Sequence, residues 1–204
     1  MTNWPKEIRI TEVGPRDGLQ NQAKQIPTQS KIELIDSLSQ TGLTCLEVSS
    51  FVHPKWVPQL SDADEVFAGI TRKDGVMYTA LVPNEHGLQR AIAAKVDGIA
   101  VLTAASETFC ERNTKTSIKE SIDRIKPIVE DATSLGMSTR GYISCVIGCP
   151  YEGKTDFAVV RQIVQKMKNI GITDIALGET IGIAVPTDIR KLYLCLECGA
   201  VDWL

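Results

Sequence analysis

The sequence predicts an α/β fold of the (β/α)8 TIM-barrel type, incomplete, with about six of its βα units present. Short apolar or β-branched runs recur along the chain, and each is followed by a helical pattern. Strict alternation of this kind predicts parallel strands joined by right-handed crossovers. The run from Ile99 to Leu102 is apolar throughout, which indicates a sheet covered on both faces. The expected strands are residues 7–13, 44–49, 76–82, 98–103, 138–146 and 174–178.

The helices between these strands have clear apolar faces. The first expected helix places Ile32, Ile35 and Leu38 on one side. A later helix begins after Ser117, because Glu120 follows at the spacing of a capping box. Its apolar positions are 118, 122, 125 and 129, and those of the next helix are 160, 163, 164, 167 and 170.

The end of the first strand favours a barrel over a doubly wound sheet. A dinucleotide-binding sheet would have Gly-x-Gly-x-x-Gly there, whereas this chain has Gly-Pro-Arg-Asp-Gly, and Pro15 opposes a phosphate-binding helix start. A closed barrel needs eight strands, which would require roughly 60 more residues. We therefore expect a single partial catalytic domain over residues 1–204, apparently truncated at its C-terminus by two units.

Composition narrows the class of partner. The net charge is −3, and the 22 Lys and Arg residues are scattered, so no basic stripe predicts nucleic-acid binding. No apolar run reaches the roughly 18 residues of a membrane span, and the N-terminus has no signal-peptide pattern. The six cysteines form no secreted-type framework, so we expect reduced thiols and a cytoplasmic location.

The segments that follow the strands are expected to be loops, and they hold most of the reactive side chains. Arg16 and Asp17 follow the first strand, Glu47 lies near the end of the second, and Glu179 follows the sixth. In a barrel these positions, with Arg140, open on one face. Arginine offers a planar fork of donors to an oxygen anion, and aspartate offers a hard oxygen to a divalent metal. The alternative for Arg16 and Asp17 is a surface ion pair in a turn.

Five motifs identify a family that the chain resembles, the hydroxymethylglutaryl-CoA lyases, which are metal-dependent Claisen-type barrel enzymes. The motifs are EVGPRDGLQN (12–21), SFVHPKWVPQ (50–59), RGYISC (140–145), GCPYEG (148–153) and LGETIG (177–182). The resemblance implies cleavage of 3-hydroxy-3-methylglutaryl-CoA to acetyl-CoA and acetoacetate, with Mg²⁺ or Mn²⁺, in leucine degradation. It also implies a CoA-thioester partner, and we expect a homodimer for the complete protein.

The resemblance implies a role for individual residues. Arg16 matches the arginine at the thioester and enolate oxygen, Asp17 a metal ligand, and Glu47 a catalytic glutamate near the metal. Glu179 matches a catalytic position where the family usually has Asp. The expected substrate-binding residues, apart from Arg16, are Gln20, Asn113, Arg140, Tyr142 and Ser144.

Other family features do not occur in these 204 residues. The resemblance implies a His-x-His metal pair and a later loop with a reactive cysteine, whereas His53 and His86 each stand alone. Cys149 aligns with a different loop, so the catalytic role is not transferred to it. Two alternatives stay open beside a truncated lyase: a non-catalytic remnant or CoA-thioester-binding module, and a condensing enzyme of the isopropylmalate or homocitrate synthase type.

Overall fold

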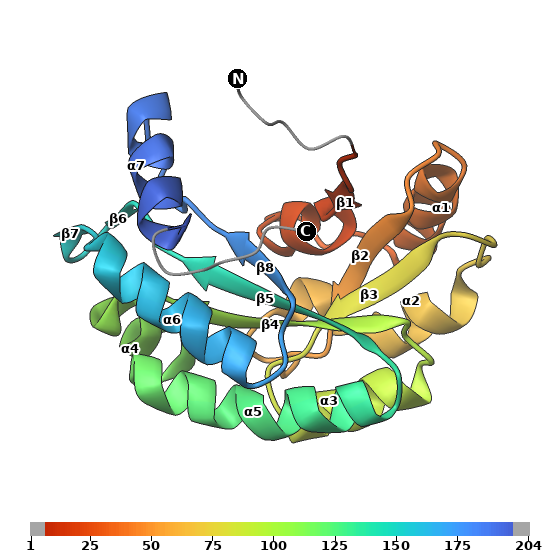
Figure 1. The fold of residues 1–204 in the computed structure, drawn as a ribbon. Helices are drawn as coiled ribbons and strands as arrows, with labels where there is room; N and C mark the ends of the chain where they lie inside the picture. The colour runs from red at the N-terminus through yellow and green to blue at the C-terminus, as the bar shows by residue number, and fades with distance from the viewer. Residues whose placement is uncertain (1–6, 198–204) are drawn as a thin grey trace. The chain divides into compact units, whose positions relative to one another are not determined.

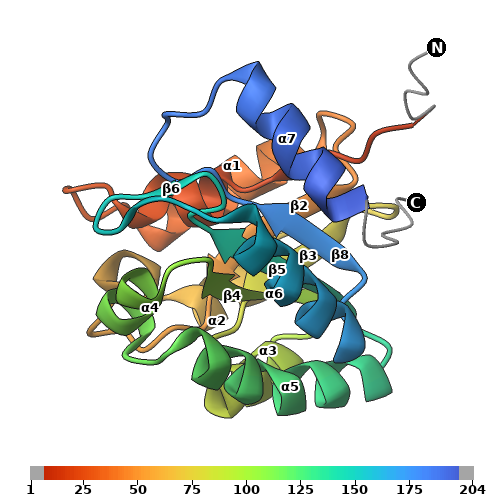
Figure 2. The ribbon, with the colours of Figure 1, turned by 60° about the vertical axis from the view of Figure 1, so that its left-hand side comes forward.

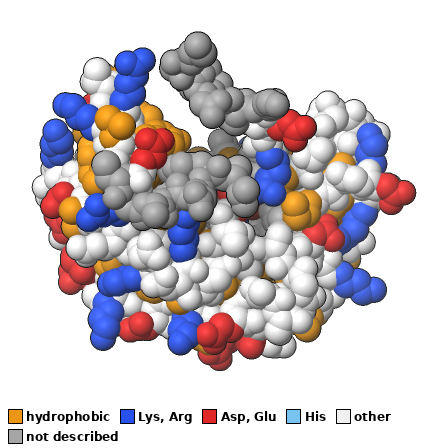
Figure 3. All heavy atoms as spheres, viewed as in Figure 1, with side chains coloured by type: hydrophobic (Ala, Val, Ile, Leu, Met, Phe, Trp, Pro, Cys, Tyr) orange, Lys and Arg blue, Asp and Glu red, His pale blue; other side chains and the backbone are white. Residues whose placement is uncertain are grey.

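A computed structural model describes residues 7–197 of the chain (Figure 1). The chain divides into two compact units, Met1–Ile99 and Ala100–Leu204, which are described separately. Within residues 7–197, no helix is long and apolar enough to cross a membrane. On the face shown in Figure 3, basic and acidic side chains are interspersed, as the small net charge leads one to expect.

The first unit contains three parallel strands, with β2 between β1 and β3. Every residue of β2 is buried, and its register with β3 shifts between Glu47 and Ser49. The elements are β1 (Thr11–Glu12), the π-helical turn η1 (Gly14–Gly18), α1 (Thr28–Ser39), β2 (Cys45–Ser50), the 3-10 turn η2 (Pro58–Leu60), α2 (Ala63–Gly69), β3 (Met77–Leu81) and α3 (Glu85–Ala93).

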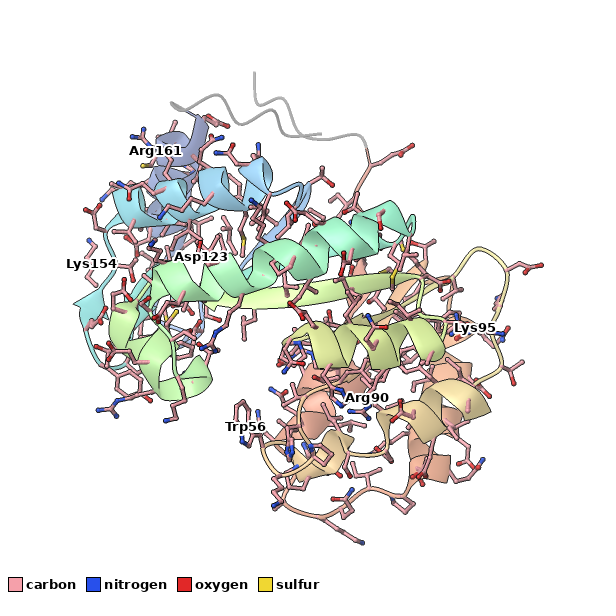
Figure 4. The ribbon with its side chains drawn as sticks, turned by 90° about the horizontal axis from the view of Figure 1, so that it is seen from below. Trp56, Arg90, Lys95, Asp123, Lys154 and Arg161 are labelled. Carbon is pink, nitrogen blue, oxygen red and sulfur yellow. The ribbon has the colours of Figure 1, made fainter. Side chains whose placement is uncertain are left out.

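Apolar side chains from both strands and helices form the core of the first unit. Ile35 of α1, Leu46 of β2 and Leu88 of α3 are fully buried. Arg90, labelled in Figure 4, ties α3 to α2, because its Nη2 donates to Asp64 Oδ2 at 2.5 Å. The amphipathic helices predicted from the sequence therefore cover the sheet through their apolar faces.

The second unit contains the strand order β4-β5-β8, and β8 pairs with β5 in parallel. A separate antiparallel hairpin is formed by β6 and β7. The elements are β4 (Gly98–Ala104, whose first two residues belong to the first unit), α4 (Glu107–Thr114), α5 (Ile118–Ser134), β5 (Ser138–Ser144), β6 (Gly148–Cys149), β7 (Gly153–Lys154), α6 (Phe157–Asn169), β8 (Asp174–Leu177) and α7 (Pro186–Glu197).

Local sequence signals account for the helices of the second unit. The capping box of Ser117 and Glu120 is present, and it starts α5. The predicted apolar face of α6 is buried at Val160, Ile163, Val164 and Met167, and α6 packs against α7 (Figure 2). Gly141 of β5 allows α6 to pack closely on this strand, since a Cβ there would lie 2.9 Å from the Met167 sulfur.

Four segments of the structure differ from what the sequence led us to expect. The first strand is limited to Thr11–Glu12, because Thr11 already pairs with Cys45, the first residue of β2. Ile8 and Ile10 are accordingly 81% and 63% exposed. The segment expected to be a loop after β1 contains η1, and the one after β4 contains α4, whose N-cap Ser106 accepts the Phe109 N–H. The segment expected to be a loop after β5 contains the β6–β7 hairpin.

Candidate functional site

The turn η1 presents Arg16 directly after β1. The Val13 carbonyl oxygen accepts N–H groups from Arg16, Asp17 and Gly18, and this shared acceptor closes the turn. Pro15 fits at its start, where a backbone N–H would have no helical partner. The Arg16 side chain turns inward and is 9% exposed. The turn therefore holds a cation at the edge of the first unit's core.

Two carboxylates fix the Arg16 guanidinium. Its Nε donates to Glu47 Oε1 at 2.5 Å, and its Nη1 donates to Asp17 Oδ1 at 2.7 Å. Glu47 is 0% exposed on β2, where burial of an ion would cost several kcal/mol without a partner. The pair with Glu47 is thus a buried ion pair, and it sets the plane of the guanidinium.

Asp17 differs from Glu47 in its exposure to solvent. The side chain of Asp17 is 55% exposed, and its Oδ1 also accepts a hydrogen bond from Gln20 Nε2 at 3.1 Å. An exposed carboxylate of this kind fits a divalent ion as one hard oxygen ligand. Among residues 7–197, no group of three or more His, Cys, Asp and Glu side chains could hold a metal ion. The described residues therefore do not complete a metal site around Asp17.

In the second unit, β5 places three of the predicted residues on one face. Arg140, Tyr142 and Ser144 alternate with buried neighbours along the strand, so their side chains share one side. Arg140 Nη1 donates to Asp174 Oδ2 at 3.0 Å, and its Cζ lies 5.5 Å from the centre of the Tyr142 ring. The strand therefore presents a cation and a phenol together.

Two other predicted residues make local contacts. The Glu179 carboxylate accepts N–H groups from Gly182, Ile183 at 2.9 Å and Ala184 at 3.2 Å, so it caps the loop that follows β8. Asn113 is exposed on α4, and its Nδ2 donates to the Phe109 carbonyl at 3.0 Å. The predicted catalytic role of Glu179 and the predicted substrate contact of Asn113 stay predictions.

A thiol that the sequence reasoning did not assign lies beside the start of α4. Cys149 Sγ accepts hydrogen bonds from Ser106 Oγ at 3.0 Å and from the Tyr151 N–H at 3.4 Å. Burial acts to raise the pKa of Cys149, but these bonds and the Glu152 N–H outweigh it, so the pKa lies below its ordinary value. In contrast, burial raises the pKa of Cys145 to about 12. The sequence signal that could have pointed to this thiol is Ser106, a serine at the N-cap of α4, which donates to Cys149.

The structure groups the predicted residues into two sets. Arg16, Asp17, Gln20 and Glu47 contact one another in the first unit. The β5 residues form the second set in the other unit. The convergence of both sets on one barrel mouth stays a prediction from the fold class.

These features define an α/β enzyme-type fold with a fixed arginine and an exposed aspartate after its first strand. The HMGL-like family matches residues 7–197, and the chain belongs to this family. The bovine mitochondrial hydroxymethylglutaryl-CoA lyase is 49% identical over 93% of this chain and 58% of its own length. The chain thus spans about three fifths of the length of the curated relatives that it matches.

Solved structures confirm the fold class. The crystal structure of the HMG-CoA lyase from Brucella melitensis matches 95% of this chain and 69% of that chain, with a TM-score of 0.93 and 42% identity. The HMG-CoA lyase from Acinetobacter baumannii, in complex with coenzyme A and 3-methylmalate, covers 90% of this chain and 60% of that chain, with a TM-score of 0.87 and 36% identity. The incomplete α/β barrel expected from the sequence is therefore confirmed.

Proposed function

We propose that the protein containing this chain is a carbon–carbon lyase that cleaves 3-hydroxy-3-methylglutaryl-CoA to acetyl-CoA and acetoacetate. Family membership and the similarity to the bovine hydroxymethylglutaryl-CoA lyase support this reaction. The observation that carries it within the chain is Arg16, held by a buried carboxylate on one side and an exposed carboxylate on the other. Leucine breakdown is the pathway that we propose for it.

The reaction is a retro-Claisen cleavage. The tertiary hydroxyl loses its proton, the bond between the carbinol carbon and the thioester's α-carbon breaks, and the electron pair moves to the thioester as an enolate. A proton added at the enolate carbon completes acetyl-CoA. The barrier therefore depends on charge that develops at the thioester oxygen, which requires a fixed positive partner.

Arg16 supplies that partner in our proposal. Its guanidinium does not have to reorganise during the reaction, because Glu47 holds Nε and Asp17 holds Nη1. A preorganised donor of this kind acts most strongly on the transition state. Since Glu47 is fully buried, we propose that it acts by positioning Arg16.

We also propose that a divalent ion, Mg²⁺ or Mn²⁺, takes part, since enzymes of this family are metal-dependent. Asp17 would be one of its ligands. When bound, such an ion makes the substrate hydroxyl more acidic.

The free thiols of the described cysteines, such as Cys45 and Cys110, support a reducing, cytoplasmic location. A homodimer is a further proposal for the complete protein.

A CoA thioester is the proposed substrate class, and the coenzyme A bound by the Acinetobacter baumannii lyase supports it. The test is incubation of the purified protein with HMG-CoA and Mg²⁺, with acetyl-CoA and acetoacetate measured separately. Equal amounts of both products, lost with chelator and with Arg16→Gln, would support the proposal. Thioester binding without turnover would instead favour a non-catalytic binding module.

A further inference from the structure

The motif at residues 50–59 has no part in the proposed chemistry, yet its last residue is buried. Gln59 lies in η2 and is only 4% exposed. Trp56, which Figure 4 labels, stands before it in the same loop and is 68% exposed. A buried carboxamide must satisfy both its oxygen and its nitrogen, so its partners show what it holds.

The partners of the Gln59 carboxamide all lie in one segment. Its Oε1 accepts the Ile26 N–H at 3.0 Å, and its Nε2 donates to the carbonyl oxygens of Lys24 at 2.9 Å and Gln22 at 3.3 Å. One side chain thus bonds three backbone groups of residues 21–27, which we call the linker. The carboxamide thus accepts from and donates to the backbone as a neighbouring strand would, although residues 21–27 form no strand.

An ion pair between the buried Lys31 and the half-buried Asp62 supports Gln59 from the other side. Lys31 Nζ donates to the Gln59 carbonyl oxygen and to Asp62 Oδ1, the latter at 2.8 Å. Asp62 Oδ2 also accepts from Thr28 Oγ1 at 2.7 Å, at the start of α1. The backbone that carries Gln59 is therefore fixed to α1, so the carboxamide can hold the linker against a rigid support.

The linker itself has little packing of its own. Six of its seven residues, all but Ile26, are exposed, and it begins one residue after Gln20. Its N-terminal end is joined to the site by the Gln22 N–H, which donates to the Leu19 carbonyl oxygen at 3.0 Å. A change in the linker therefore passes directly to the turn that presents Asp17 and Gln20.

We propose that Gln59 is a positioning residue: its buried carboxamide fixes the linker and, through it, the turn that presents Arg16, Asp17 and Gln20. This inference rests on the proposed function for the importance of that turn. It assigns to motif 50–59 a role that is separate from any substrate contact. It also predicts that the turn becomes mobile when the carboxamide is changed, even though α1 and β2 remain folded.

The test is amide hydrogen exchange of the protein and of two variants, Gln59→Glu and Gln59→Met. Loss of the hydrogen bonds is expected to speed exchange at residues 14–26 by about tenfold at pH 7.5, with α1 and β2 changed less than about twofold. Gln25→Glu is the matched control, because it adds the same charge at an exposed linker position. Circular dichroism establishes that each variant is folded.

Acidification separates positioning from general destabilisation. Protonation of the carboxyl introduced by Gln59→Glu gives it one donor again, so protection of residues 14–26 should return at low pH after correction for intrinsic exchange. Gln59→Met cannot recover in this way. In the lyase assay, Gln59→Glu should lower kcat by about tenfold and change KM less than about twofold, since the turn acts on the transition state.

Each result has a distinct meaning. Unchanged exchange at residues 14–20 in both folded Gln59 variants would overturn the proposal, as would faster exchange at 14–20 with normal kcat. Uniformly faster exchange throughout the first unit would show a structural role only and would overturn it as well. If the parent protein does not turn over HMG-CoA, the proposed function fails, and exchange at residues 14–20 alone decides whether Gln59 positions the turn.

Discussion

The buried pair of Arg16 and Glu47 leads to a quantitative prediction. Arg16→Met leaves the Glu47 carboxylate, which is 0% exposed, without the guanidinium at 2.5 Å. Removal of one partner of a buried pair costs about 3–5 kcal/mol. With a urea dependence of about 2 kcal/mol per molar, the unfolding midpoint should fall by about 2 M.

The reciprocal change should cost less. In Glu47→Leu, Arg16 keeps its contact with Asp17 at 2.7 Å, and the Asp17 side chain is 55% exposed to water. We expect a loss of about 1–3 kcal/mol, because the guanidinium is not left without a counter-ion. The double variant replaces both charges with apolar groups and should lie close to the parent in stability, within about 1–2 kcal/mol.

Urea unfolding of the four proteins, followed by circular dichroism, forms a double-mutant cycle. The expected coupling energy is at least about 2 kcal/mol. Arg90 and Asp64 provide the control pair, since their contact is also 2.5 Å but the Asp64 side chain is 56% exposed. Their coupling should not exceed about 1 kcal/mol. Additive effects of Arg16→Met and Glu47→Leu, within about 0.5 kcal/mol, would refute the interpretation as a buried, mutually dependent pair.

Three further predictions follow from the site and its thiols. If the proposed lyase activity holds, Arg16→Gln should lower kcat by about 10³-fold with a smaller change in KM, and Arg16→Lys should restore little, since a point charge does not replace the fork. Ser106→Ala should raise the pKa of Cys149, measured by ultraviolet absorbance of the thiolate, because it removes a donor to Sγ; an unchanged titration would contradict this. Because the pKa of Cys145 is raised to about 12, the native protein keeps this proton between about pH 9 and about pH 12, whereas the unfolded chain loses it. The free energy of unfolding should therefore fall as the pH rises through that window. Cys145→Ala should make this fall less steep when the free energy is measured by chemical denaturation.

Local patterns in the sequence were sufficient for most elements. The capping box of Ser117 and Glu120 and the apolar spacing of α6 depend on neighbours within a few residues, so both were predicted correctly. The extent of β1 was wrong because it depends on where β2 begins. The residue at which two strands begin to pair cannot be predicted from the hydrophobic periodicity of one strand alone.

The site was predictable in residue type more than in arrangement. The sequence placed Arg16 and Asp17 after the first strand and Glu47 near the end of the second, and the structure brings them into contact. The sequence could not show that Glu47 is buried and Asp17 exposed, because their exposure depends on the direction in which the turn η1 folds. The Glu179 carboxylate accepts hydrogen bonds from backbone N–H groups of its own loop, and a motif match does not predict this interaction.

The contrast between the two carboxylates gives the site its chemical logic. A buried ion pair is a poor source of stability, because desolvation of both charges offsets their attraction. The Arg16–Glu47 pair is nevertheless placed in the middle of β2, where the register with β3 shifts after Glu47. Such a pair is better explained by geometry, since it holds the guanidinium in one plane beside the exposed Asp17. Fixed dipoles and charges accelerate a reaction only when they need no reorganisation, and a buried partner provides that condition.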